Sequence, residues 1–203
     1  MRDPGATLFI DPQRCIGCRA CVQACSECPG HRGISMIHLD EVARSFTVQT
    51  APTVCMHCDP PACATVCPAD AIHKGPDGVV HSALPERCIG CANCALACPF
   101  GVPKVDPVRE LMVKCDLCHE RTSVGKAPMC ATVCPSGALM YGTRSEVEDQ
   151  RRARPVGIFR FGDESVRTRV QYLVPSWNET LPVNISERPT RTTAELCMEE
   201  AIV

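Results

Sequence analysis

The sequence predicts an α+β fold of small units, in which short strands and helices surround cysteine-rich loops. Sixteen of the 18 cysteines fall into four blocks, which begin at Cys15, Cys55, Cys88 and Cys115. Each block is a trio of cysteines followed by a fourth, and a short apolar stretch follows most blocks, so the pattern is an internal repeat. Eighteen prolines and an aromatic content of 4% argue against one large apolar core in these 203 residues.

The spacing inside the blocks predicts cubane [4Fe-4S] clusters. The first block is Cys15, Cys18, Cys21 and Cys25, and the third is Cys88, Cys91, Cys94 and Cys98. Both have the two, two and three intervening residues of bacterial ferredoxins. The second block is Cys55, Cys58, Cys63 and Cys67, and the fourth is Cys115, Cys118, Cys130 and Cys134. These two keep the outer spacings but lengthen the middle gap to four and to eleven residues.

The last cysteine of a block is expected to bind a different cluster from its own trio. A trio in one tight loop supplies three corners of a cluster, and the fourth corner comes from elsewhere. Cys67, Cys98 and Cys134 each precede proline, which disfavours helical geometry and turns them toward a neighbouring cluster. Blocks therefore work in pairs. Cys25 precedes serine, and Cys28-Pro29 is a nearby competitor, but only Cys25 preserves the three-residue gap.

Zinc and disulfides are the rival interpretations of so many cysteines. Structural zinc sites use two separated pairs and close at four ligands, so trios followed by Cys-Pro leave unused ligands. Disulfide scaffolds are usually short secreted chains, and no hydrophobic signal segment opens this sequence. Iron–sulfur binding is favoured over both.

The expected elements follow the blocks in order. Residues 7–10 predict a strand entering the first block, and residues 34–39 and 46–50 predict a strand pair after it. Residues 71–74 and 79–81 flank a Gly-Pro-Asp-Gly turn, and residues 137–141 repeat the strand after a block. Short helices are expected between the last two cysteines of each block. From residue 143 an extended, proline-punctuated tail is expected, with a short helix near Cys197 at residues 193–202.

Composition excludes several classes of function. The net charge is −2, from 21 basic and 23 acidic residues, which gives no electrostatic attraction to nucleic acid or anionic membranes. No stretch is long and apolar enough for a direct membrane span. The expected location is the cytoplasm, or the membrane through a partner, and export with a signal-bearing partner stays open. Because thiolate–metal bonds need the folded chain, the iron-free chain is expected to be largely unfolded.

No substrate site is evident, so the chain is not expected to be catalytic on its own. The six histidines are scattered without a catalytic partner, and no glycine-rich nucleotide motif is present. His57 and His119 lie beside cluster ligands and are interpreted as hydrogen-bonding residues. Gly17 and Gly90 are expected to permit tight turns in the cluster loops. Candidate residues for tuning cluster potentials are Arg14, Arg19, Arg87, Lys104, Lys114 and Arg121.

The block order resembles that of the four-cluster electron-transfer subunits of the dimethyl sulfoxide reductase family of molybdenum or tungsten enzymes. The similarity covers roughly residues 7–142. Three stretches carry it: Cys55-Met-His-Cys58-Asp-Pro-Pro-Ala-Cys63, Cys88-Ile-Gly-Cys91, and Lys114-Cys-Asp-Leu-Cys118-His-Glu-Arg121 with Pro128-Met-Cys130. Some relatives replace a third-block cysteine with tryptophan and hold a three-iron cluster. Cys91 is intact here, so four [4Fe-4S] clusters are expected.

This resemblance implies two ferredoxin-like domains, one inserted in the other. Residues 1–50 plus 108–142 would form the outer domain, residues 51–107 the inserted domain, and residues 143–203 a C-terminal extension. That extension could dock across a partner, or it could be a flexible or self-packing tail. The implied ligand sets are Cys15, Cys18, Cys21 and Cys134; Cys115, Cys118, Cys130 and Cys25; Cys55, Cys58, Cys63 and Cys98; and Cys88, Cys91, Cys94 and Cys67.

The implied function is electron relay. One end of the cluster row would face a large molybdopterin-containing catalytic subunit, and the other a quinone-reactive membrane subunit or a soluble carrier. Two alternatives stay open. The same relay could serve a nickel–iron hydrogenase, or the chain could be a zinc-binding structural module. The sequence assigns no role to Cys28 or Cys197.

Overall fold

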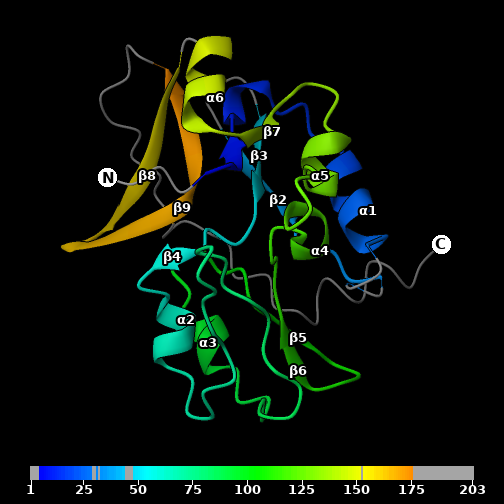
Figure 1. Ribbon diagram of the computed structural model, residues 1–203, viewed down its shortest axis with the longest axis vertical. Helices are drawn as coiled ribbons and strands as arrows, with labels where there is room; N and C mark the ends of the chain where they lie inside the picture. The colour runs from blue at the N-terminus through cyan, green and yellow to red at the C-terminus, as the bar shows by residue number, and fades with distance from the viewer. Residues whose placement is uncertain (1–4, 29–30, 32, 44–47, 152, 176–203) are drawn as a thin grey trace.

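The computed structural model describes residues 5–28, 31, 33–43, 48–151 and 153–175. Figure 1 shows two parts, one above the other. The lower part is built from the middle of the chain, between β4 (Cys58–Asp59) and β6 (Leu111–Val113). The upper part combines elements from before and after this segment. Cys197, Trp177 and the helix expected at residues 193–202 lie outside the described residues.

The largest sheet joins the two ends of the described chain. Its path is β4, β9 (Glu164–Pro175), β1 (Thr7–Ile10) and β7 (Leu139–Gly142), and β8 (Ala153–Phe161) pairs with β9. The strands expected at residues 7–10 and 137–141 are confirmed as β1 and β7, which pair in antiparallel register. β1 also pairs in parallel with β9. Leu8, Phe9 and Ile10 are completely buried, so this sheet anchors the first cysteine block.

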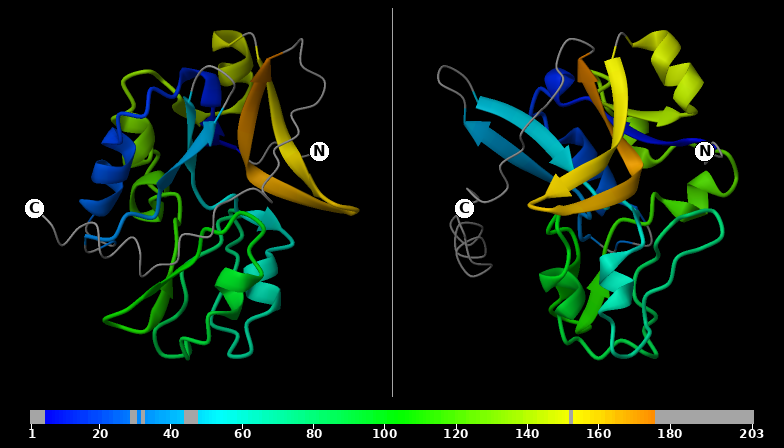
Figure 2. Two further views of the ribbon diagram at one scale, coloured as in Figure 1. Left: turned by 180° about the vertical axis from the view of Figure 1, so that it is seen from behind. Right: turned by 90° about the vertical axis from the view of Figure 1, so that its left-hand side faces the viewer.

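The structure differs from the expected extended tail over residues 144–175. Helix α6 (Arg144–Gln150) begins at a capping box, in which Thr143 Oγ1 accepts from the Glu146 backbone and the Glu146 side chain accepts from Thr143. β8 and β9 then form a long antiparallel hairpin, visible as the yellow and orange arrows in Figure 2. Val147 and Leu173 pack against Phe9. Apolar burial against β1 therefore draws this segment into the fold.

The strand pair after the first block lies two to four residues later than expected. It comprises β2 (His38–Ala43) and β3 (Val48–Thr53) in antiparallel register. The preceding residues form a loop in which the Met36 backbone N–H donates to Cys25 Sγ at 3.2 Å. The turn expected around residues 75–78 is confirmed, because Gly78 N–H donates to the Gly75 carbonyl and backbone hydrogen bonds join residues 73 and 75 to residues 81 and 79. Its arms form an isolated bridge between Lys74 and Val80 rather than two strands. A further pair, β5 (Lys104–Asp106) and β6, was not expected.

Four short helices confirm the expectation of a helical turn between the last two cysteines of each block. They are α1 (Ala20–Ser26), α2 (Ala62–Thr65), α3 (Asn93–Leu96) and α5 (Met129–Thr132). The structure adds one more such turn, α4 (His119–Thr122), in the long gap of the fourth block. Pro61 and Pro128 stand at the N-caps of α2 and α5, where proline fits because no helical N–H is lost.

The cysteines are part of the apolar core. Five of them belong to the largest cluster of buried residues, together with Leu8, Ile10, Val54 and Val170 from the sheet and its neighbouring loop. These five are Cys21, Cys25, Cys55, Cys115 and Cys130. Strands and cysteine loops thus share one interior, so the sheet fixes the positions of the thiol groups.

Candidate iron–sulfur cluster sites

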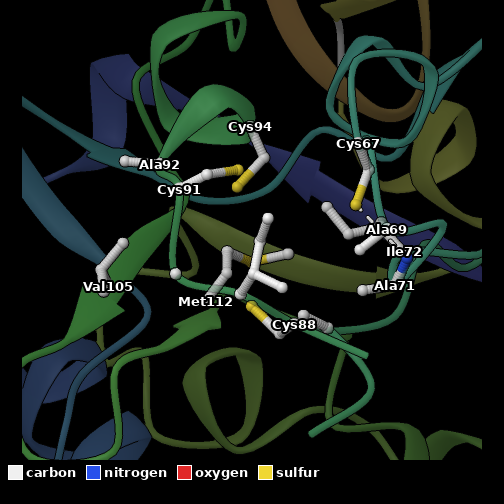
Figure 3. A pocket seen from close by; sticks show the side chains of 13 residues that line it. Cys67, Ala69, Ala71, Ile72, Cys88, Cys91, Ala92, Cys94, Val105 and Met112 are labelled. Atoms are coloured by element: carbon white, nitrogen blue, oxygen red, sulfur yellow. Dashed lines mark hydrogen bonds between the residues drawn. The ribbon is translucent and has the colours of Figure 1, made fainter. Parts of the chain in front are cut away.

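The clearest site is a pocket that joins the second and third cysteine blocks. It has about 350 Å³ of empty space and is lined by Cys67, Cys88, Cys91 and Cys94 with apolar side chains such as Ile72. Figure 3 shows the four sulfur atoms arranged around this space, with Cys67 facing the three cysteines of the third block. A cysteine that precedes proline therefore lies opposite a trio from another block.

A second pocket repeats this arrangement in the upper part of the molecule. It has about 300 Å³ of empty space and is lined by Cys15, Cys18, Cys21 and Cys134. Burial, together with the nearby thiols of Cys134, Cys15 and Cys18, raises the pKa of the Cys21 thiol to about 11. The first and last blocks, more than a hundred residues apart in the sequence, thus meet here.

The third group of thiols belongs to Cys55, Cys58, Cys63 and Cys98. Burial, together with the thiols of Cys55, Cys98 and Cys63, raises the pKa of Cys58 to about 12. Cys55, Cys58 and Cys98 also belong to one cluster of packed side chains. Cys98, which precedes proline, here joins the trio of the second block. The arrangement mirrors that of Cys67 in the first pocket.

The fourth group surrounds Cys115 and Cys130 in the interior. Burial raises the pKa of Cys115 far above its usual value, and the neighbouring thiols of Cys55 and Cys130 add to the effect. Burial and the thiols of Cys118 and Cys25 likewise raise the pKa of Cys130 far above its usual value. The proximity of Cys115 to Cys55 brings this group next to the third one.

Backbone and side-chain donors point at several of these sulfur atoms. Thr50 Oγ1 donates to Cys15 Sγ at 3.2 Å, and the backbone N–H groups of Ala71 and Leu117 donate to the sulfurs of Cys67 and Cys115 at 3.3 and 3.4 Å. Donors of this kind stabilise thiolate ligands and tune the metal centre.

The two glycines predicted to allow tight turns do so. Gly17 and Gly90 have φ angles of +69° and +66°. A Cβ atom at Gly90 would lie 2.8 Å from the carbonyl oxygen of Glu110, and at Gly17 it would lie 3.3 Å from Thr50 Cγ2. Both loops therefore need glycine for backbone conformation and for space.

The donor chemistry fits iron–sulfur clusters better than zinc. Within the described part of the chain, no three histidine, cysteine or acidic side chains converge closely enough to hold a single metal ion. A structural zinc site needs four ligands at one point. Four thiols spread around a pocket suit the corners of a larger, multi-iron group.

Comparisons with known proteins agree with this chemistry. A 4Fe-4S dicluster domain matches residues 46–144, and a 4Fe-4S binding domain matches residues 6–27. A subunit of the anaerobic dimethyl sulfoxide reductase of Escherichia coli is 36% identical over 152 residues, which are 68% of this chain and 74% of that subunit. The protein belongs to the iron–sulfur subunit family of molybdopterin oxidoreductases.

Two formate dehydrogenase subunits show the extent of the similarity to longer family members. The nitrate-inducible iron–sulfur subunit of Escherichia coli is 37% identical over 161 residues, 68% of this chain and 54% of that protein. The iron–sulfur subunit of Haemophilus influenzae is 35% identical over 163 residues, 69% of this chain and 52% of that protein. The chain thus spans about half the length of these formate dehydrogenase subunits.

The surroundings of Cys25 and Cys28 bear on which of them faces the fourth block. Cys25 is buried, and His31 Nδ1 lies 3.3 Å from its sulfur. Burial opposes ionisation of Cys25, but hydrogen bonds from His31 and the Met36 backbone lower its pKa below the usual value. Cys28 is half-buried, its Sγ donates to the Ala24 carbonyl at 3.4 Å, and burial raises its pKa. Cys28 also contacts Cys118 of the fourth block, so the two cysteines differ in their hydrogen bonds rather than in which block they face.

His31 and Asp116 form a contact that sequence reasoning did not anticipate. His31 Nε2 lies 4.0 Å from Asp116 Oδ1, and Nδ1 lies 2.6 Å from the Cys25 carbonyl oxygen. The Asp116 carboxylate and then the hydrogen-bonded Cys25 raise the pKa of His31 to about 10. No local sequence motif predicts this contact, because His31 and Asp116 are 85 positions apart in the sequence.

The two histidines beside the cysteines lie in different surroundings. His57 is fully buried, its Nδ1 accepts from the Val80 backbone N–H at 2.9 Å, and burial and then the charge of Lys114 lower its pKa well below the usual value. His119 Nδ1 lies 3.4 Å from Asp77 Oδ2 near the surface. Hydrogen bonding thus accounts for His57.

The basic residues near the blocks differ in their exposure and in their partners. Arg14 and Arg87 are half-exposed and pair with Asp11 and Asp70, so solvent screens their charges. Arg19 is exposed at the start of α1, Arg121 Nε donates to the Ala127 carbonyl at 2.9 Å, and Lys104 Nζ donates to the Ser35 carbonyl at 3.0 Å. Lys114 differs from these because only 1% of it is exposed.

Proposed function

We propose that this chain relays electrons through four [4Fe-4S] clusters between a molybdenum or tungsten bis-pterin catalytic subunit and a quinone-reactive membrane subunit or a soluble carrier. The observation that carries the proposal is the pocket in which Cys67 faces Cys88, Cys91 and Cys94. A cysteine set drawn from two blocks is what paired ferredoxin-type clusters require.

The four proposed ligand sets combine each trio with a cysteine from its partner block. They are Cys15, Cys18, Cys21 and Cys134; Cys25, Cys115, Cys118 and Cys130; Cys55, Cys58, Cys63 and Cys98; and Cys67, Cys88, Cys91 and Cys94. The grouping of thiols in both pockets and in the interior supports these sets. Residues 51–107 would then be a domain inserted into the outer domain of residues 1–50 and 108–142.

The chain's own residues bind, shield and tune the sites. Clusters bound there would each accept and release one electron. The thiolates hold the iron, apolar walls such as Ile72 and Met112 exclude water, and backbone N–H groups offer hydrogen bonds to the ligand sulfurs. Cys18 and Cys91 are exposed, so the groups they would bind lie near the surface, where a partner can exchange electrons.

The partners are inferred from the family. The relatives are named as subunits of formate dehydrogenase and dimethyl sulfoxide reductase, and we extend to this chain the need for a large catalytic subunit. None of the described helices is long and apolar enough to cross a membrane. We include a quinone-reactive membrane subunit among the proposed partners.

Anaerobic affinity purification of the tagged full chain from its own cells tests this function. We expect a large subunit to copurify with molybdenum or tungsten, measured by elemental analysis of the complex. Nickel with a hydrogenase large subunit would replace the proposal by the hydrogenase alternative. Purification of the chain with zinc and no labile sulfide would contradict any electron relay.

A further inference from the structure

Lys114 is a buried cation without an ion-pair partner in the described part of the chain. Only 1% of the residue is exposed, and no described carboxylate pairs with it. The nearby Asp116 carboxylate lies 4.0 Å from His31, and the charge of Lys114 acts on it only after that of His31. Lys114 Nζ donates to the carbonyl oxygens of Val80 and of Cys115, the latter at 3.1 Å. A lysine ammonium has three donors, and the third has no acceptor among the described residues.

The position of Lys114 joins the two parts of the molecule. Its backbone N–H donates to Ser82 Oγ at 3.1 Å, and Ser82 Oγ donates back to the Lys114 carbonyl at 3.1 Å. Val80 and Ser82 lie between the second and third blocks, whereas Cys115 opens the fourth. Since Cys115 and Cys55 are electrostatic neighbours, Lys114 lies where two of the proposed ligand sets approach each other.

Burial of an unpaired charge is costly and calls for compensation. Removing an ammonium from water is costly, and two neutral carbonyls satisfy two of its three donors without balancing its charge. Four thiolates around a [4Fe-4S] cluster carry a net negative charge. Such a group beside Lys114 would supply the missing compensation.

The contacts of Lys114 connect it to one ligand set. Lys114 Nζ donates to the Val80 carbonyl, and the Val80 backbone N–H donates to His57 Nδ1 at 2.9 Å. His57 is fully buried and lies between Cys55 and Cys58, which belong to the set with Cys63 and Cys98. That set is therefore the one whose charge Lys114 balances.

We propose that Lys114 raises the reduction potential of the cluster held by Cys55, Cys58, Cys63 and Cys98. One-electron reduction adds one negative charge to the cluster, and a fixed cation in a low-dielectric interior stabilises the reduced form. Lys114 is thus a tuning residue at the junction between the two parts, and it favours electron arrival at this cluster. The proposal rests on the proposed function, because it needs the clusters to be present.

The test is a redox titration followed by electron paramagnetic resonance on anaerobically purified full-length variants. Lys114→Gln removes the charge but keeps an amide donor for the Val80 carbonyl. We expect the equilibrium between reduced and oxidised cluster to shift at least tenfold toward the oxidised form, or about 59 mV for one electron. The other three clusters should shift less. A Cys63→Ser variant shows which step of the titration belongs to this cluster, because it changes one of the ligands of this cluster and of no other.

Two further variants separate charge from structure. Lys114→Arg keeps the positive charge, so its reduction potential should stay within about 59 mV of the wild-type value. Lys74→Gln is the matched control, because Lys74 Nζ also reaches a cysteine carbonyl, that of Cys58 at 3.3 Å, but is paired with Asp59 at 2.7 Å and partly exposed. Its potential shift should be much smaller than that of Lys114→Gln.

Each outcome decides the inference. An unchanged potential in Lys114→Gln with full iron content would overturn it and leave the relay intact. If Lys114→Gln loses this cluster while Lys114→Arg retains it, the requirement for charge is upheld. If both variants lose it, Lys114 has a packing role and the proposal fails. Absence of iron from the wild-type chain would instead refute the proposed function itself.

Discussion

At the scale of single residues, the roles of neighbouring cysteines can be separated. Cys25 receives a backbone hydrogen bond from Met36 and contacts His31, whereas Cys28 donates its own thiol to a carbonyl. Thiolates bind iron, and thiols do not. The environment of each sulfur therefore decides between two cysteines that spacing alone leaves in competition.

Replacement of Cys25 and Cys28 by alanine should give opposite results. Cys25→Ala should lose between about one and four iron atoms per chain, because one cluster loses a ligand. Cys28→Ala should retain the full iron content. Iron analysis of the two purified variants checks this, and iron loss in Cys28→Ala alone would transfer the ligand role to Cys28.

Gly90→Ala should destabilise the protein more than Gly125→Ala. Both glycines have positive φ angles, but a Cβ at Gly90 would meet the Glu110 carbonyl at 2.8 Å, while one at Gly125 would meet nothing within 4 Å. The clash should add about 1–3 kcal/mol to the backbone strain that both share. Urea unfolding of both variants under anaerobic conditions measures the difference, and equal midpoints would contradict the close approach.

Sequence reasoning at this scale found the cysteines, both turn glycines and Lys114 as a tuning candidate, but not the contacts of Thr50 and His31. Spacing within a block is local, so the cysteine pattern and the need for Gly17 and Gly90 could be predicted. The Thr50 hydroxyl reaches Cys15 across 35 positions, and His31 reaches Asp116 across 85. Contacts of that kind depend on the folded chain and leave no local signal.

At the scale of elements, the hairpin β8–β9 and helix α6 are structural parts of the fold. β9 pairs with β1, and Leu173 and Val147 pack on Phe9. β1 leads directly into the first cysteine block. This segment therefore supports the site that holds Cys15, Cys18 and Cys21.

Leu173→Ala should destabilise the protein by about 2–5 kcal/mol, the usual cost of a truncated core leucine. Leu173 is 2% exposed, whereas Ile158 on the paired strand is 57% exposed. Ile158→Ala is thus the matched control and should cost about 0.5 kcal/mol or less. Anaerobic urea unfolding measures both, and a negligible effect of Leu173→Ala would mean that the hairpin does not belong to the core.

The missed hairpin had a signal in the sequence. Gly162-Asp163 links the two strands, and such a two-residue turn between apolar, β-branched stretches is typical of a hairpin. Prolines in this region favoured an extended tail, but Pro155 lies in β8, which pairs with a single neighbour, β9. An edge strand tolerates proline because one side needs no hydrogen bonds.

At the scale of the whole molecule, thiol groups and apolar side chains share one interior. The largest buried cluster contains five cysteines beside the sheet residues. Binding of metal to such cysteines contributes directly to folding. The stability of the chain should therefore depend on its iron.

Removal of iron by a chelator under reducing conditions should unfold most of the chain. We expect loss of most of the far-ultraviolet circular dichroism signal and of cooperative thermal unfolding. Reconstitution with iron and sulfide should restore both signals. An iron-free chain that keeps its secondary structure and melts cooperatively would show that the apolar core suffices.

The pairing of the blocks could not be derived from spacing. Proline after Cys67, Cys98 and Cys134 indicates that each turns away from its own trio, but not which trio it meets. Which trio each of these cysteines meets depends on how the segment between α3 and α5 folds against the other blocks. That arrangement is a property of the whole chain. The proposed pairs came from the family resemblance, and the structure places the corresponding thiols near one another.

The most direct measurement is the iron and acid-labile sulfide content of the anaerobically purified chain, followed by electron paramagnetic resonance during reduction. With four clusters, we expect about sixteen iron atoms per chain, a similar amount of sulfide and coupled signals of reduced four-iron clusters. Zinc without sulfide, or clearly fewer iron atoms with no further signal on reduction, would contradict the four-cluster relay.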